Sequence, residues 1–322
     1  MTHFWPAALV ASMAFASVHG NERPAPAPST SAADAIAATQ LEWEDGPLYA
    51  APTGQDRIGR IAAPVMINGQ GPFRLILDTG ANQSVITTRL AQQLGLTLTP
   101  ESQLMMHGVT GSLQVPSVVL ESFETGDLVQ RNVKVAVLDT VMGGADGILG
   151  TQGFEGMRIT VDFRRDRITI ERSRGQRARS TEGTIPAELK FGRLLVCSGY
   201  VGAIRVKAVI DTGAQMTLGN LALRDALLRR RGADHGPDNA TVIGLNLAEQ
   251  TGRYLHTPRI LLGDAEIENA PIIYGDIHVF KMWELEDTPA ILVGMDILGA
   301  LEKLVIDYRR EEIQFRNAYR LN

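Results

Sequence analysis

The sequence contains the same short pattern twice, and this repeat restricts the fold more than any other feature. Residues 75–84 read LILDTGANQS and residues 208–217 read AVIDTGAQMT, so apolar residues lead into Asp-Thr-Gly-Ala in both. The two aspartates, Asp78 and Asp211, are 133 positions apart (211 − 78). Ser84 and Thr217 lie three positions beyond the two alanines. A repeat at this distance indicates one structural unit present twice.

The two halves match again further along the chain. The triplet Ile-Leu-Gly at 148–150 precedes RITVDF, and Leu-Val-Gly at 292–294 precedes LVIDY. The last glycines of the triplets are 144 positions apart (294 − 150), which fits a duplicated unit with insertions in the second copy. Hairpin-like stretches precede the aspartates at 65–75 and 200–209.

Most of the remaining chain consists of short β-branched runs separated by Gly, Pro, Asn or Asp. Such runs are found at 133–139, 158–163, 167–171 and 258–263. Only two helical patterns stand out, one at 87–96 that stops near Gly95 and one at 220–232 that Asn220 opens. The pattern predicts a mainly β protein of two tandem β domains with few helices.

The ends and joints of the domains follow from composition. We expect a signal peptide at 1–20, a flexible spacer at 21–54, a first lobe at 55–171, a linker at 172–183 and a second lobe at 184–322. Residues 4–18 are apolar or small and contain Ala14-Phe15-Ala16, a typical cleavage pattern. No Lys or Arg precedes this run, so a disordered apolar tail and a short lipid-embedded anchor remain alternatives. We expect a periplasmic or secreted protein with no stable membrane span after signal removal.

The linker at 172–183 holds four arginines and no large apolar residue. A solvated connection between domains is the favoured interpretation, and a basic docking strip for an anionic partner is the alternative.

Composition excludes several classes of function. Lys and Arg number 31 against 36 Asp and Glu, for a net charge of −5, whereas nucleic-acid-binding proteins carry a basic excess. The six histidines and one cysteine show no metal-site spacing, so neither a metal nor another cofactor is expected. Cys197 lies in an apolar run and is expected to be a buried thiol. Trp283 and the acidic stretch to residue 289 are expected to form a surface insertion.

An aspartate at the end of an apolar strand is costly to bury unless it has partners or a chemical role. If the two loops meet about a pseudo-two-fold axis, each half supplies one carboxylate. Two adjacent carboxylates share a proton, so the ionised one can deprotonate a water while the protonated one donates to a substrate carbonyl.

Asp78-Thr79-Gly80-Ala81 and Asp211-Thr212-Gly213-Ala214 resemble the active-site signatures of retropepsin-like and pepsin-like aspartic peptidases. The resemblance covers roughly residues 55 to 318, and it includes the two apolar-Gly triplets, which in that family thread beneath the aspartate loops. It implies a bilobal fold, Asp78 and Asp211 as the catalytic dyad, and a peptide or protein as substrate. Thr79 and Thr212 would interlock the two loops, supported by Gly80 and Gly213. The chain is expected to be a monomer that forms an internal pseudo-dimer.

The resemblance also implies a flap. The best candidate is the turn at 105–113, MMHGVTGSL, with His107 within it and Gly108 and Gly111 as hinges. The corresponding stretch of the second half is 242–254, and the pepsin-like flap tyrosine has no counterpart in the first half. Because alanine replaces the hydroxyl residue that often follows the motif in pepsin-like enzymes, we expect a mildly acidic to near-neutral pH optimum.

Three alternatives remain open. The same fold can serve as a non-catalytic peptide-binding module, or each half can pair with another chain. A glycosidase also uses paired carboxylates, but it has no need of a duplicated β unit.

Overall fold

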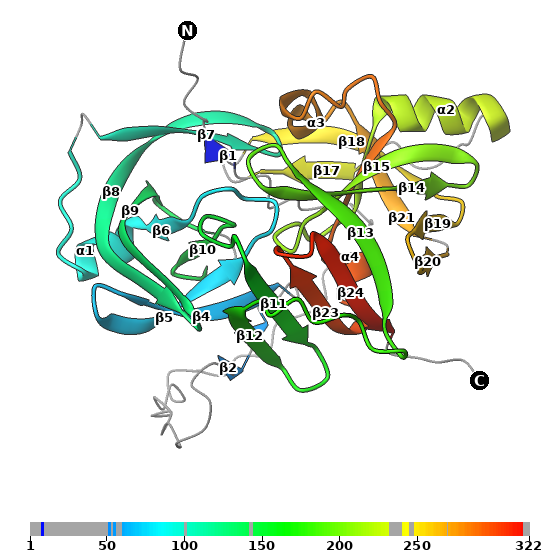
Figure 1. Ribbon diagram of the computed structural model, residues 1–322. Coiled ribbons are helices and arrows are strands. Elements are labelled where there is room, and N and C mark those ends of the chain that lie inside the picture. Colours follow the sequence, from blue (N-terminus) through cyan, green and yellow to red (C-terminus); the bar gives the residue numbers. More distant parts are fainter. Residues whose placement is uncertain are drawn as a thin grey trace, which may run out of the picture.

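The computed structural model describes residues 60–317, except 100–101, 142–143, 232–239, 245–247 and 269, together with three short strands before residue 60. These are β1 (Ala8–Leu9), β2 (Ala51–Pro52) and β3 (Gly54–Gln55). Apart from these strands, the predicted signal peptide and the spacer lie outside the described residues. The fold is mainly β, as the sequence predicts, and its strands form two large sheets (Figure 1).

The first lobe is built around one sheet. Its elements are β4 (Ile61–Ile67), β5 (Gln70–Leu77), β6 (Val85–Thr87), α1 (Thr88–Gln93), β7 (Gln103–Gly108), β8 (Gly111–Thr125), β9 (Leu128–Leu138) and β10 (Gly147–Leu149). The sheet order is β1-β7-β8-β9-β6-β10-β5-β4-β3. Asn68 and Gly69 form the turn between β4 and β5 with φ values of 51° and 72°, the left-handed backbone that two-residue hairpin turns require.

The second lobe repeats this arrangement with additional elements. They are β14 (Leu194–Val201), β15 (Ile204–Ile210), β16 (Leu218–Asn220), α2 (Leu221–Arg231), β17 (Ala240–Ile243), β18 (Glu249–His256), β19 (Ile260–Leu262), β20 (Ala265–Ile267), β21 (Pro271–Gly275), α3 (His278–Met282), β22 (Ala290–Val293) and α4 (Met295–Leu298). None of the helices among the described residues is long and apolar enough to cross a bilayer.

One end of the larger, 15-stranded sheet joins the two halves of the chain, and we call this part the central sheet. It contains β11 (Met157–Asp162), β12 (Arg167–Arg172), β13 (Gly183–Lys190), β23 (Leu301–Asp307) and β24 (Glu312–Asn317). Strand β11 of the first half pairs antiparallel with β23 of the second half, with Ile159 opposite Ile306. The hairpins that end the two repeats therefore lie side by side below the lobes (Figure 1).

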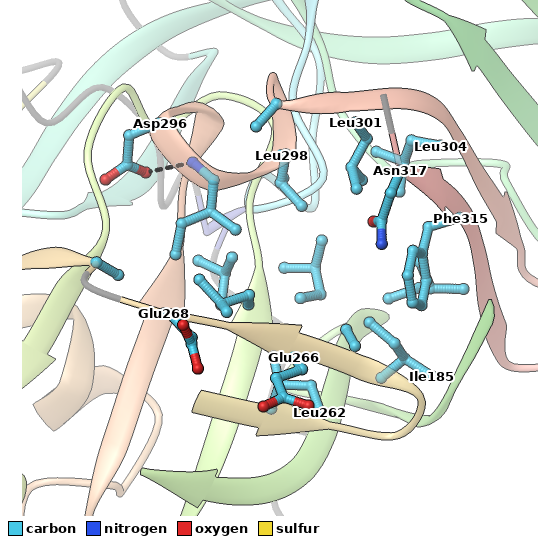
Figure 2. Close-up of a pocket in the computed structure, with 18 of the residues that line it drawn as sticks. Ile185, Leu262, Glu266, Glu268, Asp296, Leu298, Leu301, Leu304, Phe315 and Asn317 are labelled. Atoms are coloured by element: carbon cyan, nitrogen blue, oxygen red, sulfur yellow. Dashed lines mark hydrogen bonds between the residues drawn. The ribbon is translucent and has the colours of Figure 1, made fainter. Parts of the chain in front are cut away.

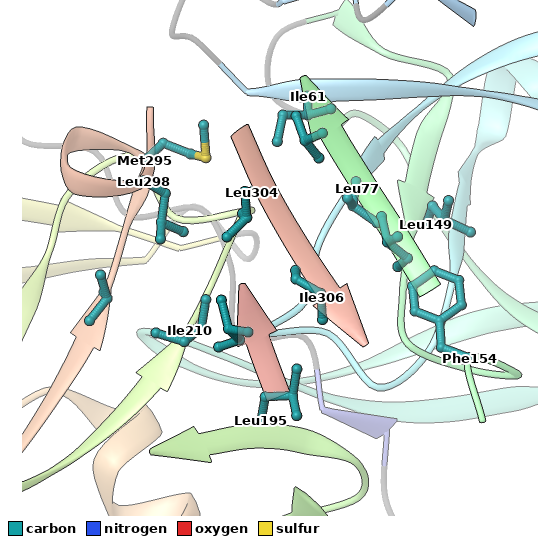
Figure 3. Packing of buried hydrophobic residues seen from close by; sticks show 14 of the residues in the cluster. Ile61, Leu77, Leu149, Phe154, Leu195, Ile210, Met295, Leu298, Leu304 and Ile306 are labelled. Carbon is teal, nitrogen blue, oxygen red and sulfur yellow. The ribbon is translucent and has the colours of Figure 1, made fainter. Parts of the chain in front are cut away.

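The apolar core is continuous from one lobe to the other. Figure 3 shows Leu77 and Leu149 of the first lobe, Ile210 of the second, and Leu304 and Ile306 of the central sheet packed in one cluster. All five side chains are buried. Removing this apolar surface from water is the main force that holds the lobes together.

The predicted linker crosses the outer face of the central sheet. Its backbone is fixed by polar contacts: Arg158 donates to the carbonyl of Gln176 at 3.3 Å, and Arg309 donates to the carbonyl of Ser173 at 3.0 Å. The hydroxyl of Ser173 also donates to the buried carboxylate of Asp307 at 2.8 Å. The segment is thus anchored to strands from both halves, although its arginine side chains at 174, 177 and 179 are exposed.

The predicted surface insertion of the second lobe is wrong for Trp283, whereas the acidic residues Glu284, Glu286 and Asp287 are exposed as expected. Trp283 is 1% exposed and packs edge-on against Phe280, so it belongs to the core rather than to a surface insertion. The acidic stretch after it folds back on the chain, because the side-chain amide of Asn220 donates to the carbonyls of Leu285 and Thr288, both at 2.6 Å. Cys197, in contrast, is buried as expected.

Candidate active site

Each aspartate of the repeat follows a buried strand and is held there by the apolar triplet of its own half. The amide of Asp78 donates to the carbonyl of Leu149, and the amide of Asp211 donates to that of Val293, both at 3.0 Å. The triplet strands β10 and β22 run parallel to β5 and β15, which end at the two aspartates. Both carboxylates therefore lie at the ends of central strands whose last three residues are buried.

The hydroxyl three positions beyond each alanine supports this arrangement. Ser84 accepts a hydrogen bond from the amide of Gly150, and Thr217 accepts one from the amide of Gly294, each at 3.1 Å. In the second lobe Thr217 also donates to Asp296 at 2.7 Å. Ser84 and Thr217 can be found from the sequence because they occupy the same position in both copies of the repeat, whereas nothing in the local sequence indicates the role of Asp296.

The two Asp-Thr-Gly loops interlock across the boundary between the lobes. Thr79 donates its hydroxyl to the carbonyl of Ile210 at 2.7 Å, and Thr212 donates its hydroxyl to that of Leu77 at 2.8 Å. Each hydroxyl also accepts from the backbone amide of the other threonine, at 3.1 and 3.2 Å. These four bonds join positions 131 to 135 residues apart, so the loops from the two halves are fixed to each other.

The carboxyl groups of Asp78 and Asp211 are fully buried and lie close enough to affect each other. The amide of Gly80 donates to Asp78 Oδ1 at 2.9 Å, and the amides of Gly213 and Ala214 donate to Asp211 Oδ1 at 2.8 and 3.1 Å. The remaining oxygen of each carboxyl, Oδ2, is also buried, and the two side chains interact with each other directly.

Burial raises the pKa of both aspartates. For Asp78, desolvation is the largest cause, and the neighbouring negative charge of Asp211 raises the pKa further. For Asp211, desolvation outweighs the backbone N–H groups that lower the pKa. Because two charges at this spacing in a dry site repel each other, the pair keeps one proton at pH values where a lone aspartate has lost it.

Gly80 is required by the close approach of the loops. A Cβ atom on this residue would meet Asp211 Oδ2 at 2.4 Å, inside the contact distance of any real side chain. The residue next to it, Ala81, is buried and carries no hydroxyl, and the same is true of Ala214 in the second lobe. Backbone amides donate to both carboxyl groups at the positions where a hydroxyl side chain is missing.

Comparison with known proteins agrees with this geometry. Residues 63–152 match the family model of aspartyl proteases. The first lobe is an aspartyl protease domain. The crystal structure of an aspartic proteinase from Irpex lacteus has a similar fold, with 12% sequence identity, a TM-score of 0.52, and coverage of 83% of this chain and 96% of that chain. No curated protein matches the chain.

The structural match extends beyond the protease domain itself. Because it covers 83% of this chain, it includes much of the second lobe, and it shows that the two lobes together adopt the bilobal pepsin-like fold. At this level of identity the match concerns the fold, and the chemistry must be inferred from the residues.

The predicted flap residues lie on a hairpin of the protease domain. Gly108 ends β7 and Gly111 begins β8, with Val109 and Thr110 as the turn between them. His107 is half-buried, and its Nδ1 atom lies 2.5 Å from the hydroxyl of Ser112 on the opposite strand. The corresponding stretch of the second lobe forms the hairpin of β17 and β18.

The hairpin of the protease domain does not end in solvent. The carbonyl of Val109 accepts a hydrogen bond from the amide of Val279 at 3.1 Å, and the Val109 side chain is fully buried. Ser112 is also hydrogen-bonded to His278 Nε2 at 3.1 Å. No local pattern indicates these contacts, because α3 and the hairpin are far apart in the chain.

A cavity lies between the second lobe and the central sheet. It has a volume of about 480 Å³, and its walls are mainly apolar, including Leu298 and Phe315 (Figure 2). Ile210, the residue before Asp211, lines the cavity, but the side chains of Asp78 and Asp211 do not. The cavity is therefore separate from the paired carboxyl groups, and we assign it no ligand.

Proposed function

We propose that this chain is an aspartic endopeptidase, in which a water held between Asp78 and Asp211 attacks the peptide bond. The interlocked Asp-Thr-Gly loops are the observation that carries this proposal. They bring two buried carboxyl groups together from opposite lobes, where the two side chains interact directly. The aspartyl protease family match over residues 63–152 supports the same class of reaction.

The raised pKa values of both aspartates suit the proposed reaction. With one proton shared by the pair, the ionised carboxylate accepts a proton from the water as it attacks the carbonyl carbon. The protonated carboxyl donates a hydrogen bond to the carbonyl oxygen, which stabilises the negative charge that develops there. Return of the proton to the leaving nitrogen completes hydrolysis, so no covalent intermediate is needed.

The neighbouring residues hold the carboxyl groups in place. Thr79 and Thr212 set the distance between the loops, and the amides of Gly80 and Gly213 fix one oxygen of each aspartate. Since alanine replaces the hydroxyl residue after each motif, one hydrogen bond that would lower the pKa is missing from each side. We therefore expect an activity optimum between mildly acidic and neutral pH, and an optimum below about pH 3 would contradict this reasoning.

A non-catalytic peptide-binding module is the second candidate, and a single experiment separates the two. The purified chain and its Asp211→Asn variant are incubated with a diverse peptide mixture from about pH 3 to 8, and new termini are read by mass spectrometry. Asp225→Asn, an exposed aspartate on α2, serves as the matched control. Cleavage by the parent chain and the control, but not by Asp211→Asn, is the expected result.

Absence of cleavage at every pH, also after residues 21–54 are removed, would contradict the protease and favour the binding module. Peptide binding without cleavage would then be measured by titration. The cut sites, if found, give the side-chain preference directly.

The proposed enzyme acts as a monomer outside the cytoplasm. One chain supplies both aspartates, so a second copy is not needed for the dyad. The apolar run at 4–18 with its Ala14-Phe15-Ala16 pattern supports export to the periplasm or the medium. Sedimentation of the purified chain and sequencing of its mature N-terminus test these two points.

A further inference from the structure

The hairpin of β7 and β8 is docked on the opposite lobe. Val109 at its tip is fully buried in a cluster whose other members, including Ile277, Val279 and Phe280, come from the second lobe. The amide of Val279 donates to the carbonyl of Val109 at 3.1 Å. In Figure 1 the two strands reach from the first lobe toward α3. Val109 is thus part of the core of the second lobe, although its hairpin belongs to the first lobe.

A side-chain bridge lies beside this contact. His107 and Ser112 face each other across β7 and β8, with His107 Nδ1 2.5 Å from Ser112 Oγ. Ser112 Oγ lies 3.1 Å from Nε2 of His278, the first residue of α3. The backbone amide of His278 donates to Gln250 Oε1 at 3.1 Å, which fixes the start of α3 on β18. The bridge therefore connects the hairpin to an anchored helix.

The chemistry of this bridge depends on protonation. The hydroxyl of Ser112 has one proton to donate, and it can accept a hydrogen bond from the other side. A bridge that also uses the hydroxyl proton needs one ring nitrogen without a proton facing the serine. When both rings are charged, both nitrogens donate to the same oxygen and two positive charges stand on either side of it. The doubly protonated bridge is therefore unfavourable.

We propose that His278 is a positioning residue, which holds the hairpin closed on the second lobe through Ser112 and releases it when His107 and His278 become protonated. For its effect on catalysis this latch rests on the proposed function, whereas the docking of the hairpin does not. Asp78 and Asp211 are 0% exposed in the closed arrangement, so a peptide reaches them only after a covering segment moves. The hairpin packs beside both motifs, since Met106 shares a buried cluster with Ala81 and Val109 shares one with Ala214, so its release supplies such a movement.

The surrounding charges favour the neutral form of both histidines while the hairpin is closed. Burial lowers the pKa of His107, and the nearby His278 lowers it further. Burial also lowers the pKa of His278, with a second contribution from Lys281 on the same helix. Asp276 pairs with Lys281 at 2.9 Å and reduces its effect. On β18 the group in contact is the uncharged Gln250.

The sign of the pH dependence follows from these shifts. A histidine whose pKa is lower in the closed form binds protons more tightly in the open form. The stabilisation of the closed hairpin by the two neutral histidines is therefore complete above the ordinary histidine pKa of about 6.5, and it decreases as the pH falls below that value. The latch opens toward the acidic side of the expected activity range.

Amide hydrogen exchange of the full chain tests the latch without any need for catalysis. The amide of Val279 is the direct probe, since it is bonded to the hairpin. After correction for the intrinsic effect of pH on exchange, its protection should fall by about tenfold between pH 7.5 and pH 5.5, the effect of one pKa unit. In His278→Gln, whose side chain hydrogen-bonds but does not titrate, this pH dependence should become clearly weaker, because only His107 still titrates.

Two further variants complete the test. His278→Ala removes the bridge, so protection of the Val279 amide should be low at every pH, while the amides of α2 report whether the lobe is still folded. Lys190→Gln, at an exposed residue of β13, should behave like the parent chain. An unchanged pH dependence in His278→Gln, or unchanged protection in His278→Ala, would overturn the latch.

Kinetics separates the latch from the proposed function. If the parent chain cleaves peptides, His278→Gln should flatten the pH profile of KM with little change in kcat at neutral pH. If the parent chain cleaves nothing, the proposed function fails, and the exchange of the Val279 amide still decides whether the latch exists.

Discussion

Thr79 and Thr212 hold each other by reciprocal hydrogen bonds. The amide of each donates to the hydroxyl of the other, at 3.2 and 3.1 Å, although 133 residues separate them in the chain. Each hydroxyl also donates to the carbonyl of the residue directly before the aspartate of the other lobe. Thr79 donates to Ile210, and Thr212 donates to Leu77. The position of one carboxyl group is thereby tied to that of the other.

Replacing one of these threonines by an isosteric apolar residue should weaken the joint between the lobes. Thr212→Val leaves the carbonyl of Leu77 and the amide of Thr79 buried without their partner. At about 1–3 kcal/mol for each unpaired group, the free energy of unfolding should fall by about 2–4 kcal/mol. Denaturant unfolding measures this, and Thr212→Ser, which keeps the hydroxyl, should lose much less. Equal losses in the two variants would show that the hydroxyl does not matter.

The buried aspartates should destabilise the fold at neutral pH. Because folding raises the pKa of Asp78, the folded state binds its proton more tightly than the unfolded state does. Its contribution is therefore favourable at low pH and is lost as the pH rises above the unfolded value of about 3.9. Asp78→Asn should raise the melting temperature at pH 7 and leave it unchanged near pH 3, while it abolishes cleavage. A variant that melts lower at pH 7 would contradict this prediction.

The buried ion pair of the central sheet should be essential for stability. Arg158 donates to Asp307 at 2.8 Å, and the two side chains are 9% and 0% exposed. Arg158→Met leaves the carboxylate buried without its main partner and should cost about 3–5 kcal/mol. As a control, Arg165→Met breaks the surface pair with Asp162, in which Arg165 is 74% exposed, and should cost less than about 1 kcal/mol. Urea unfolding of both variants gives the comparison.

Asn220 should contribute more than an ordinary helix cap. Its carbonyl oxygen accepts from the amides of Leu223 and Ala290, at 2.9 and 3.1 Å, in addition to the two bonds that its amide donates. Asn220→Ala should cost about 3 kcal/mol, because several buried groups lose their partner together. Thr87→Ala, which removes a single cap bond to Leu90, should cost about 0.5–2 kcal/mol. Thermal unfolding of the two variants distinguishes them.

Much of the architecture was predictable because it depends on short-range patterns. The mainly β fold followed from short apolar runs with turn residues between them. The start of α2 followed from Asn220, whose side chain accepts from Leu223 as a capping residue does. The repeat of Asp-Thr-Gly led to the expectation that two loops meet. A pattern repeated in one chain produces similar local structure twice, and this is visible without coordinates.

Other features depended on contacts that no local pattern contains. Trp283 was misplaced on the surface because the acidic residues after it suggested solvent, whereas its partners in the core come from other segments. The bridge from Ser112 to His278 joins positions 166 residues apart. Whether such residues meet depends on how one lobe is placed on the other.

The sequence by itself determined that the chain contains two similar β units, each with an aspartate at the end of an apolar strand. Periodicity and turn residues act over a few positions, and their information is therefore local. The tertiary structure decided that the carboxyl groups lie together in a dry site, that the linker is anchored, and that the hairpin tip is buried in the opposite lobe. These features arise from packing the two lobes on one continuous core, which fixes distances between residues that are far apart in the chain.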